Sequence, residues 1–111
     1  MNIDMDILER LDGLVSRYEE VSTLITDAHV IADQKRYVKL TKEYKDLGKL
    51  MDVRKEYMGC LQNMEDAKEM LAEETDPDTK AMLRDELATS EKRIPELEEE
   101  IKLLLVPADP E

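Results

Sequence analysis

The sequence predicts an all-α protein, an elongated antiparallel helical hairpin with a third packed helix, in other words a coiled-coil-like three-helix bundle. Of its 111 residues, 41% are hydrophobic and 40% are charged, and it contains no Trp, no Phe and only three glycines. Long amphipathic helices have such a composition. Apolar residues also recur at steps of three and four, and no segment alternates with the period of two expected of a strand.

The first expected helix occupies about 20 residues near the N-terminus. Its apolar stripe consists of Ile7, Leu11, Leu14, Tyr18, Val21 and Ile25. Charged residues fill the opposite face. The stripe is interrupted at residues 26–29, where we expect a loop, and Asp33 or a neighbour can cap the helix that follows.

The second expected helix is the longest and runs roughly from Asp33 to Glu74, which is about 60 Å at 1.5 Å per residue. Two successive stripes define it: Tyr37, Leu40, Tyr44, Leu47 and Met51, then Leu50, Val53, Tyr57, Leu61, Met64 and Leu71. Gly48 and Gly59 weaken this helix without ending it.

The third expected helix begins at a distinct turn. Asp76 is placed as its N-cap, Pro77 as its first residue, and Asp78 beside the positive end of its dipole. Its stripe consists of Leu83, Leu87, Ile94, Leu97, Ile101 and Leu104, with Ser90 in an apolar position. Pro95 removes a backbone hydrogen bond and clashes with the carbonyl of Glu91, so we expect a kink or a break there, at a cost of about 3 kcal/mol.

Residues 103–111 contain the end of this helix and then two prolines. Proline cannot continue a helix, and it drives the preceding residue towards extended geometry. We therefore expect residues 1–106 to form a helical N-terminal domain, and residues 107–111 to begin a linker to a further domain that carries much of the chemistry.

The chain shows no sign of export or membrane insertion. Its N-terminus lacks the basic and apolar regions of a signal peptide, and no apolar run approaches membrane-spanning length. The single Cys60 cannot form an internal disulfide, which favours an intracellular, cytoplasmic setting. Its helical surroundings predict a buried structural cysteine and not a reactive thiol.

Net charge restricts the partners of this domain. With 28 acidic and 16 basic residues, the formal net charge is −12. Polyanions are bound through Lys and Arg, so direct nucleic-acid binding is disfavoured. A basic protein surface is a better partner.

Two surface features have both a functional and a structural interpretation. The acidic runs at 73–74 and 96–100 could bind a cation, but neither has the spacing of a calcium loop, and solvated helix surface is the favoured interpretation. The methionines at positions 51, 58, 64 and 70 could form an adaptable docking surface. Gap-filling in a slender core is favoured for them.

No enzymatic motif is present. His29 is the only histidine, and it lies in an expected loop without an obvious partner for acid–base catalysis. The chain has no glycine-rich phosphate loop, no nucleophile elbow and no Cys/His zinc spacing. We expect no catalytic, cofactor-binding or metal-binding residue here, and no enzymatic activity.

Two segments carry a resemblance to a known family. Residues 31–47, IADQKRYVKLTKEYKDL, and the exit LLLVPADP at 103–110 resemble in order and spacing the N-terminal domain of bacterial peptide chain release factor 1, a class I factor that ends translation at stop codons. The exit is more similar to that family than to release factor 2. The resemblance covers essentially the whole chain, although Pro95 lies where the family usually has an uninterrupted helix.

The resemblance implies an accessory domain. The family's Gly-Gly-Gln motif, which promotes hydrolysis of peptidyl-tRNA, and its stop-codon-reading tripeptide are absent from this chain and would lie beyond Glu111. The implied codons are UAA and UAG. The implied partners are the ribosome, at a basic protein of the large-subunit stalk-base region, and the class II release-factor GTPase, directly or indirectly. Heptad periodicity alone also allows a free-standing coiled-coil adaptor or a prefoldin-like chaperone subunit, and self-association of the fragment stays open.

Overall fold

The computed structural model describes residues 3–106, which form four helices and no strand. The helices are α1 (Ile3–Leu24), α2 (Ala28–Ala32), α3 (Gln34–Glu73) and α4 (Pro77–Leu105). The molecule measures 63 × 29 × 20 Å, and its radius of gyration is 19.1 Å. A compact domain of this length would have a radius of gyration of about 13 Å. The prediction of an elongated all-α bundle is confirmed.

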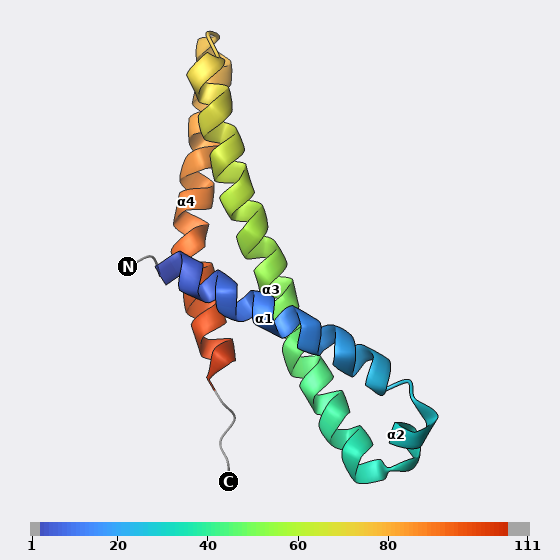
Figure 1. Ribbon diagram of the computed structural model, residues 1–111. Coiled ribbons are helices and arrows are strands. Elements are labelled where there is room, and N and C mark those ends of the chain that lie inside the picture. Colours follow the sequence, from blue (N-terminus) through green and yellow to red (C-terminus); the bar gives the residue numbers. More distant parts are fainter. Residues whose placement is uncertain (1–2, 107–111) are drawn as a thin grey trace.

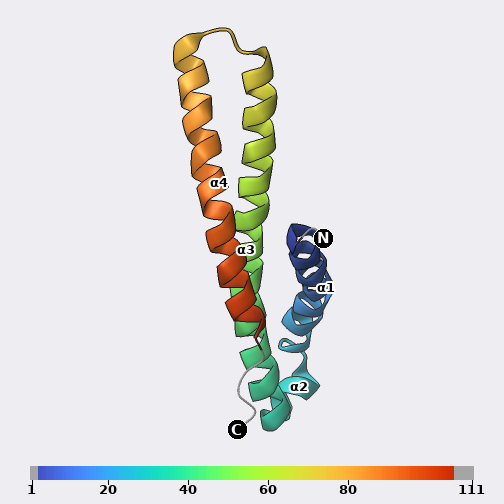
Figure 2. The same cartoon turned by 90° about the vertical axis from the view of Figure 1, so that its left-hand side faces the viewer.

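The long helices α3 and α4 form an antiparallel hairpin (Figure 1). The first helix, α1, crosses the lower part of this hairpin and packs mainly against α3, while α2 packs against the beginning of α3. Both views show the other end of the hairpin extending away from α1 and α2 (Figures 1 and 2). We call residues 62–92, which form that end, the distal hairpin.

Aspartate residues begin three of the four helices. Asp27, Asp33 and Asp76 each accept a hydrogen bond from a backbone N–H in the first turn of the helix that follows. For Asp76 the donor is the N–H of Thr79, 3.0 Å away, and Pro77 follows as the first helical residue. Each cap satisfies a donor that would otherwise lack an intrahelical partner. The predicted boundaries of α3 and α4 are therefore confirmed.

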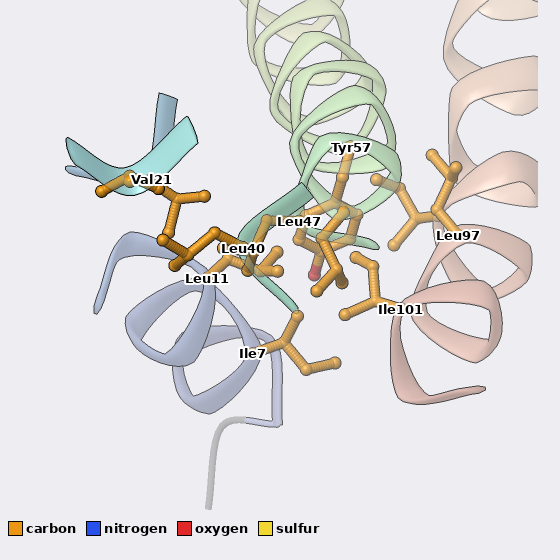
Figure 3. Packing of buried hydrophobic residues seen from close by; sticks show 11 residues of the cluster. Ile7, Leu11, Val21, Leu40, Leu47, Tyr57, Leu97 and Ile101 are labelled. Carbon is orange, nitrogen blue, oxygen red and sulfur yellow. The ribbon is translucent and has the colours of Figure 1, made fainter. Parts of the chain in front are cut away.

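The core lies where α1, α3 and α4 meet (Figure 3). It consists of Ile7, Leu11, Val21, Val30, Leu40, Leu47, Leu50, Tyr57, Ile94, Leu97 and Ile101. All but Val30 belong to the stripes predicted from the sequence. In the distal hairpin the only buried residues are Ala67, Leu83 and Ser90, so its interior is thinner. Ser90 does occupy an apolar position, as predicted.

The structure differs from the prediction at two places. The expected loop at 26–29 is only a short turn, because Asp27 caps the five-residue α2, which contains His29. The break expected at Pro95 does not occur, since α4 is one continuous helix in Figure 2. The proline ring lies on the exposed face, while its neighbours Ile94 and Leu97 are buried in the core. Packing on that opposite face keeps the helix in place across the missing hydrogen bond.

Candidate functional site

A polar joint fixes α1 on α3. The guanidinium of Arg17 donates from Nε and Nη2 to the two carboxylate oxygens of Glu43, at 2.6 and 2.7 Å. Beside this pair, the rings of Tyr18 and Tyr44 stack with centroids 5.2 Å apart and planes inclined by 7°. The hydrogen bond from Arg17 lowers the pKa of Glu43. Bidentate geometry and ring stacking both fix orientation as well as distance, so this joint sets how α1 crosses the hairpin.

A second group of polar contacts holds α4 against α3. Arg93 donates from Nε to Glu56 of α3 at 2.7 Å, and its Nη1 lies 3.1 Å from carboxylate oxygens of both Glu96 and Glu100. The Arg93 hydrogen bond lowers the pKa of Glu56. One guanidinium thus bridges two helices and forms ion pairs with three carboxylates.

The acidic run at 96–100 is therefore part of the hairpin's own packing. Glu96 and Glu100 face Arg93, and Glu98 accepts a hydrogen bond from the buried Tyr57 hydroxyl at 2.9 Å. Glu99 is exposed, and the described part of the chain shows no such contact for it. The prediction of plain solvated surface fits the exposed Glu96 and Glu99, and it is wrong only for the half-buried Glu98 and Glu100 among these four glutamates. The signal in the sequence was Arg93, which lies three and seven residues before two of them on one helix face.

The two glutamates at the hairpin turn, Glu73 and Glu74, have different surroundings. Glu74 accepts hydrogen bonds from the backbone N–H groups of Thr75 and Asp76, at 3.1 and 3.0 Å. Its carboxylate thereby stabilises the turn, whereas Glu73 is exposed. Only Glu73 fits the predicted solvated surface.

The carboxylates of the distal hairpin are different, because they have no cationic partner within residues 3–106. Residues 62–92 contain ten acidic and four basic side chains, a formal net charge of −6. None of these ten carboxylates forms an ion pair within the described residues. Two methionines, Met70 and Met82, are exposed on the same part of the hairpin. This surface can meet a cationic partner and offer it adaptable apolar contacts.

Other residues singled out by the sequence are scattered. Met51 and Met64 pack against the core as predicted. Cys60 also packs against the core, but it is only half-buried where the sequence predicted a buried cysteine. Met58 and Met70 are exposed, so gap-filling is wrong for these two. In residues 3–106 no group of three His, Cys, Asp or Glu side chains could hold a metal ion. No helix in that range combines the length and apolar character needed to cross a membrane.

The comparisons with known proteins decide the family. A family model described as the PCRF domain matches residues 14–111. The chain belongs to the PCRF domain family. The resemblance derived from the sequence segments is confirmed, because this PCRF domain is also similar along almost its whole length to proteins named peptide chain release factor 1.

Three relatives illustrate the range of similarity. The release factor 1 of Bacteroides fragilis is 67% identical over 105 residues, and that of Bacteroides thetaiotaomicron is 65% identical over the same length, each match covering 95% of this chain and 28% of the relative. The Clostridium tetani protein is 42% identical over 104 residues, covering 94% of this chain and 29% of the relative. The PCRF domain described here thus spans little more than a quarter of these relatives. No solved structure matches the chain.

Proposed function

We propose that this PCRF domain is the accessory N-terminal domain of a cytoplasmic peptide chain release factor of the release factor 1 type, and that it supplies ribosome contacts and no chemistry. The observation that supports this most is 67% identity, over 95% of the chain, to proteins with that name. Stop-codon reading, with UAA and UAG as codons, and hydrolysis of peptidyl-tRNA are assigned to the remaining part of the factor. Residues 1–106 are the domain, and residues 107–111 begin its linker.

The proposed contact surface is the distal hairpin. Among the described residues its carboxylates form no ion pair. It extends away from α1 and α2 (Figure 2), and its own interior is thin. A basic ribosomal protein in the stalk-base region of the large subunit is the partner of matching charge. Contacts of this kind act mainly on association rate and orientation. Coupling to the class II release-factor GTPase, directly or indirectly, follows from occupancy of the same region of the ribosome.

The test compares two variants of the full-length factor with equal changes in net charge. Glu65→Gln, Glu69→Gln and Glu86→Gln remove three exposed carboxylates from the distal hairpin. The control removes three exposed carboxylates elsewhere, through Glu9→Gln, Glu19→Gln and Glu99→Gln. None of the six forms an ion pair in the described residues, so both variants should fold normally.

The hairpin variant should associate with ribosomes about three- to tenfold more slowly at low salt, and its rate should depend less on ionic strength. The control should behave like the parent factor. Equal behaviour of the two variants would mean that the distal hairpin is not the contact surface.

A further inference from the structure

A row of lysines lies along one face of the first half of α3. The row consists of Lys35, Lys39, Lys42, Lys45 and Lys49, and we call it the lysine face. Successive members are separated by four, three, three and four residues. At 100° and 1.5 Å per residue, they occupy a sector of about 120° and a length of about 21 Å. All five side chains are exposed.

Most of this positive charge is not neutralised by ion pairs within residues 3–106. Between Lys35 and Lys49, Asp46 is the one carboxylate within the same sector, and it pairs with Lys42 at 2.9 Å. That pair is exposed on both sides, and such pairs exchange readily for another partner because they contribute little. The neighbouring Glu43 is turned to Arg17. The other four lysines form no ion pair in the described part of the chain.

The net charge of the whole chain does not cancel this face. Residues 34–55 contain eight basic and three acidic side chains, a formal net charge of +5, against −6 for the distal hairpin. The middle of the lysine face, Lys42, is separated from Glu69 by 27 residues of one helix, or about 40 Å. That distance is about five Debye lengths at physiological ionic strength. Within α3, a ligand at the lysine face therefore meets a segment of net positive charge.

We propose that the lysine face binds the phosphate backbone of RNA. A row of flexible cations along one helix face suits a linear polyanion. Lys and Arg bind such a polyanion by displacing the counterions from its phosphates. A protein partner is less suitable, because protein–protein interfaces are depleted in Lys. Among the described residues of this row, Val38 is the one large apolar side chain that is exposed. This inference rests on the proposed function, which makes the ribosome the source of the RNA. It differs from the expectation, based on the net charge of the whole chain, that the domain does not bind nucleic acid.

The test uses the 111-residue chain and a labelled 20-nucleotide single-stranded RNA of mixed sequence, followed by fluorescence anisotropy. If three or four phosphates are neutralised, the affinity should fall about 20- to 50-fold between 50 and 200 mM salt. The variant Lys39→Gln, Lys45→Gln, Lys49→Gln should bind at least about tenfold more weakly at 50 mM salt and lose most of that salt dependence.

The matched control is Lys68→Gln, Lys92→Gln, Lys102→Gln, which removes the same charge from exposed positions outside the lysine face. It should bind RNA within about twofold of the parent chain. Circular dichroism should show equal helix content for all three proteins.

Absence of RNA binding at 50 mM salt, or equal weakening by the two variants, would overturn the proposal. If the lysine-face variant of the full-length factor lost ribosome affinity although the isolated chain bound no RNA, the face would bind an acidic protein instead. The RNA assay contains no ribosome, so a negative result there does not test the proposed function. The ribosome association rates of the distal-hairpin variant and its control test the proposed function separately.

Discussion

The hydroxyl of Tyr57 on α3 donates a hydrogen bond to a carboxylate oxygen of Glu98 on α4, 2.9 Å away. The tyrosine has no accessible surface and lies within the core, so this polar contact is made at the centre of the helix junction. This hydrogen bond and the contacts of Arg93 show that carboxylates hold α3 and α4 together in the part of the hairpin that α1 crosses. In the distal hairpin, Glu74 and Asp76 stabilise the turn, whereas the other eight acidic residues are exposed.

Replacement of Tyr57 by Phe should lower the free energy of unfolding by about 1.5–3 kcal/mol, because hydrogen bonds to charged groups contribute that much and the partner is only partly exposed. Urea unfolding followed by circular dichroism measures the loss. Tyr37→Phe is the matched control, since Tyr37 is also on α3, is half-buried and has no hydroxyl hydrogen bond in the described residues. An equal loss of unfolding free energy in the control would show that the hydrogen bond from Tyr57 to Glu98 does not stabilise the fold.

Leu97→Ala should lower the free energy of unfolding by about 2–5 kcal/mol, because Leu97 is wholly buried between α3 and α4 and its truncation leaves a cavity. The comparison is Leu103→Ala, six residues further along α4, where the side chain is 71% exposed. That variant should differ from the parent by less than about 0.5 kcal/mol. Similar losses for both would contradict the packing of α4 described above.

Pro95→Ala should raise the stability of the protein by up to about 3 kcal/mol, because alanine restores a backbone N–H within a continuous helix. Pro95 is exposed, so the exchange removes no core contact. Thermal unfolding of the two proteins gives the difference. A decrease in the unfolding temperature would mean that the proline geometry is needed for the packing of Ile94 and Leu97.

The bond between Arg17 and Glu43 should make stability depend on pH in a defined direction. Arg17 lowers the pKa of Glu43 in the folded state, so the unfolded state binds the proton more readily. The contribution is therefore complete above the unfolded pKa of about 4.3 and is lost as pH falls through the lower folded pKa.

Glu43→Gln should consequently be less stable than the parent at pH 7, and the difference should shrink towards pH 3. Urea midpoints at pH 7, 5, 4 and 3 measure it. Glu19→Gln, an exposed position without an ion pair in the described residues, should show no such convergence. A difference that is constant across this range would mean that the Glu43 charge does not stabilise the joint.

The sequence allowed the helices to be predicted because local signals determine them. Asp33 and Asp76 mark the starts of α3 and α4, and apolar spacing identifies the core face of each helix. The five-residue α2 is too short for any periodicity. The Arg17–Glu43 pair spans 26 residues of sequence, and it depends on the crossing of α1 over α3, which no local pattern encodes.

The net charge of the whole chain predicts the candidate surfaces only in part, because it hides differences between segments. In a molecule 63 Å long, the two ends of α3 are electrostatically separate. Counting charge by segment distinguishes the basic start of α3 from the acidic distal hairpin. The spacing of Arg93, Glu96 and Glu100 on one helix also indicates their pairing. Leu87 belongs to the third apolar stripe, but it is only half-buried because the interior of the distal hairpin is thin.

We propose that this domain positions a release factor and takes no part in hydrolysis. The most direct measurement is the rate of peptide release from stalled termination complexes as a function of factor concentration, for the full-length factor and for the same factor without residues 1–106. The truncated factor should reach a maximal rate within about threefold of the full-length value, with a half-saturating concentration raised about tenfold or more. A maximal rate that collapses at saturating concentration would contradict the account, because the domain would then contribute to the hydrolytic step itself.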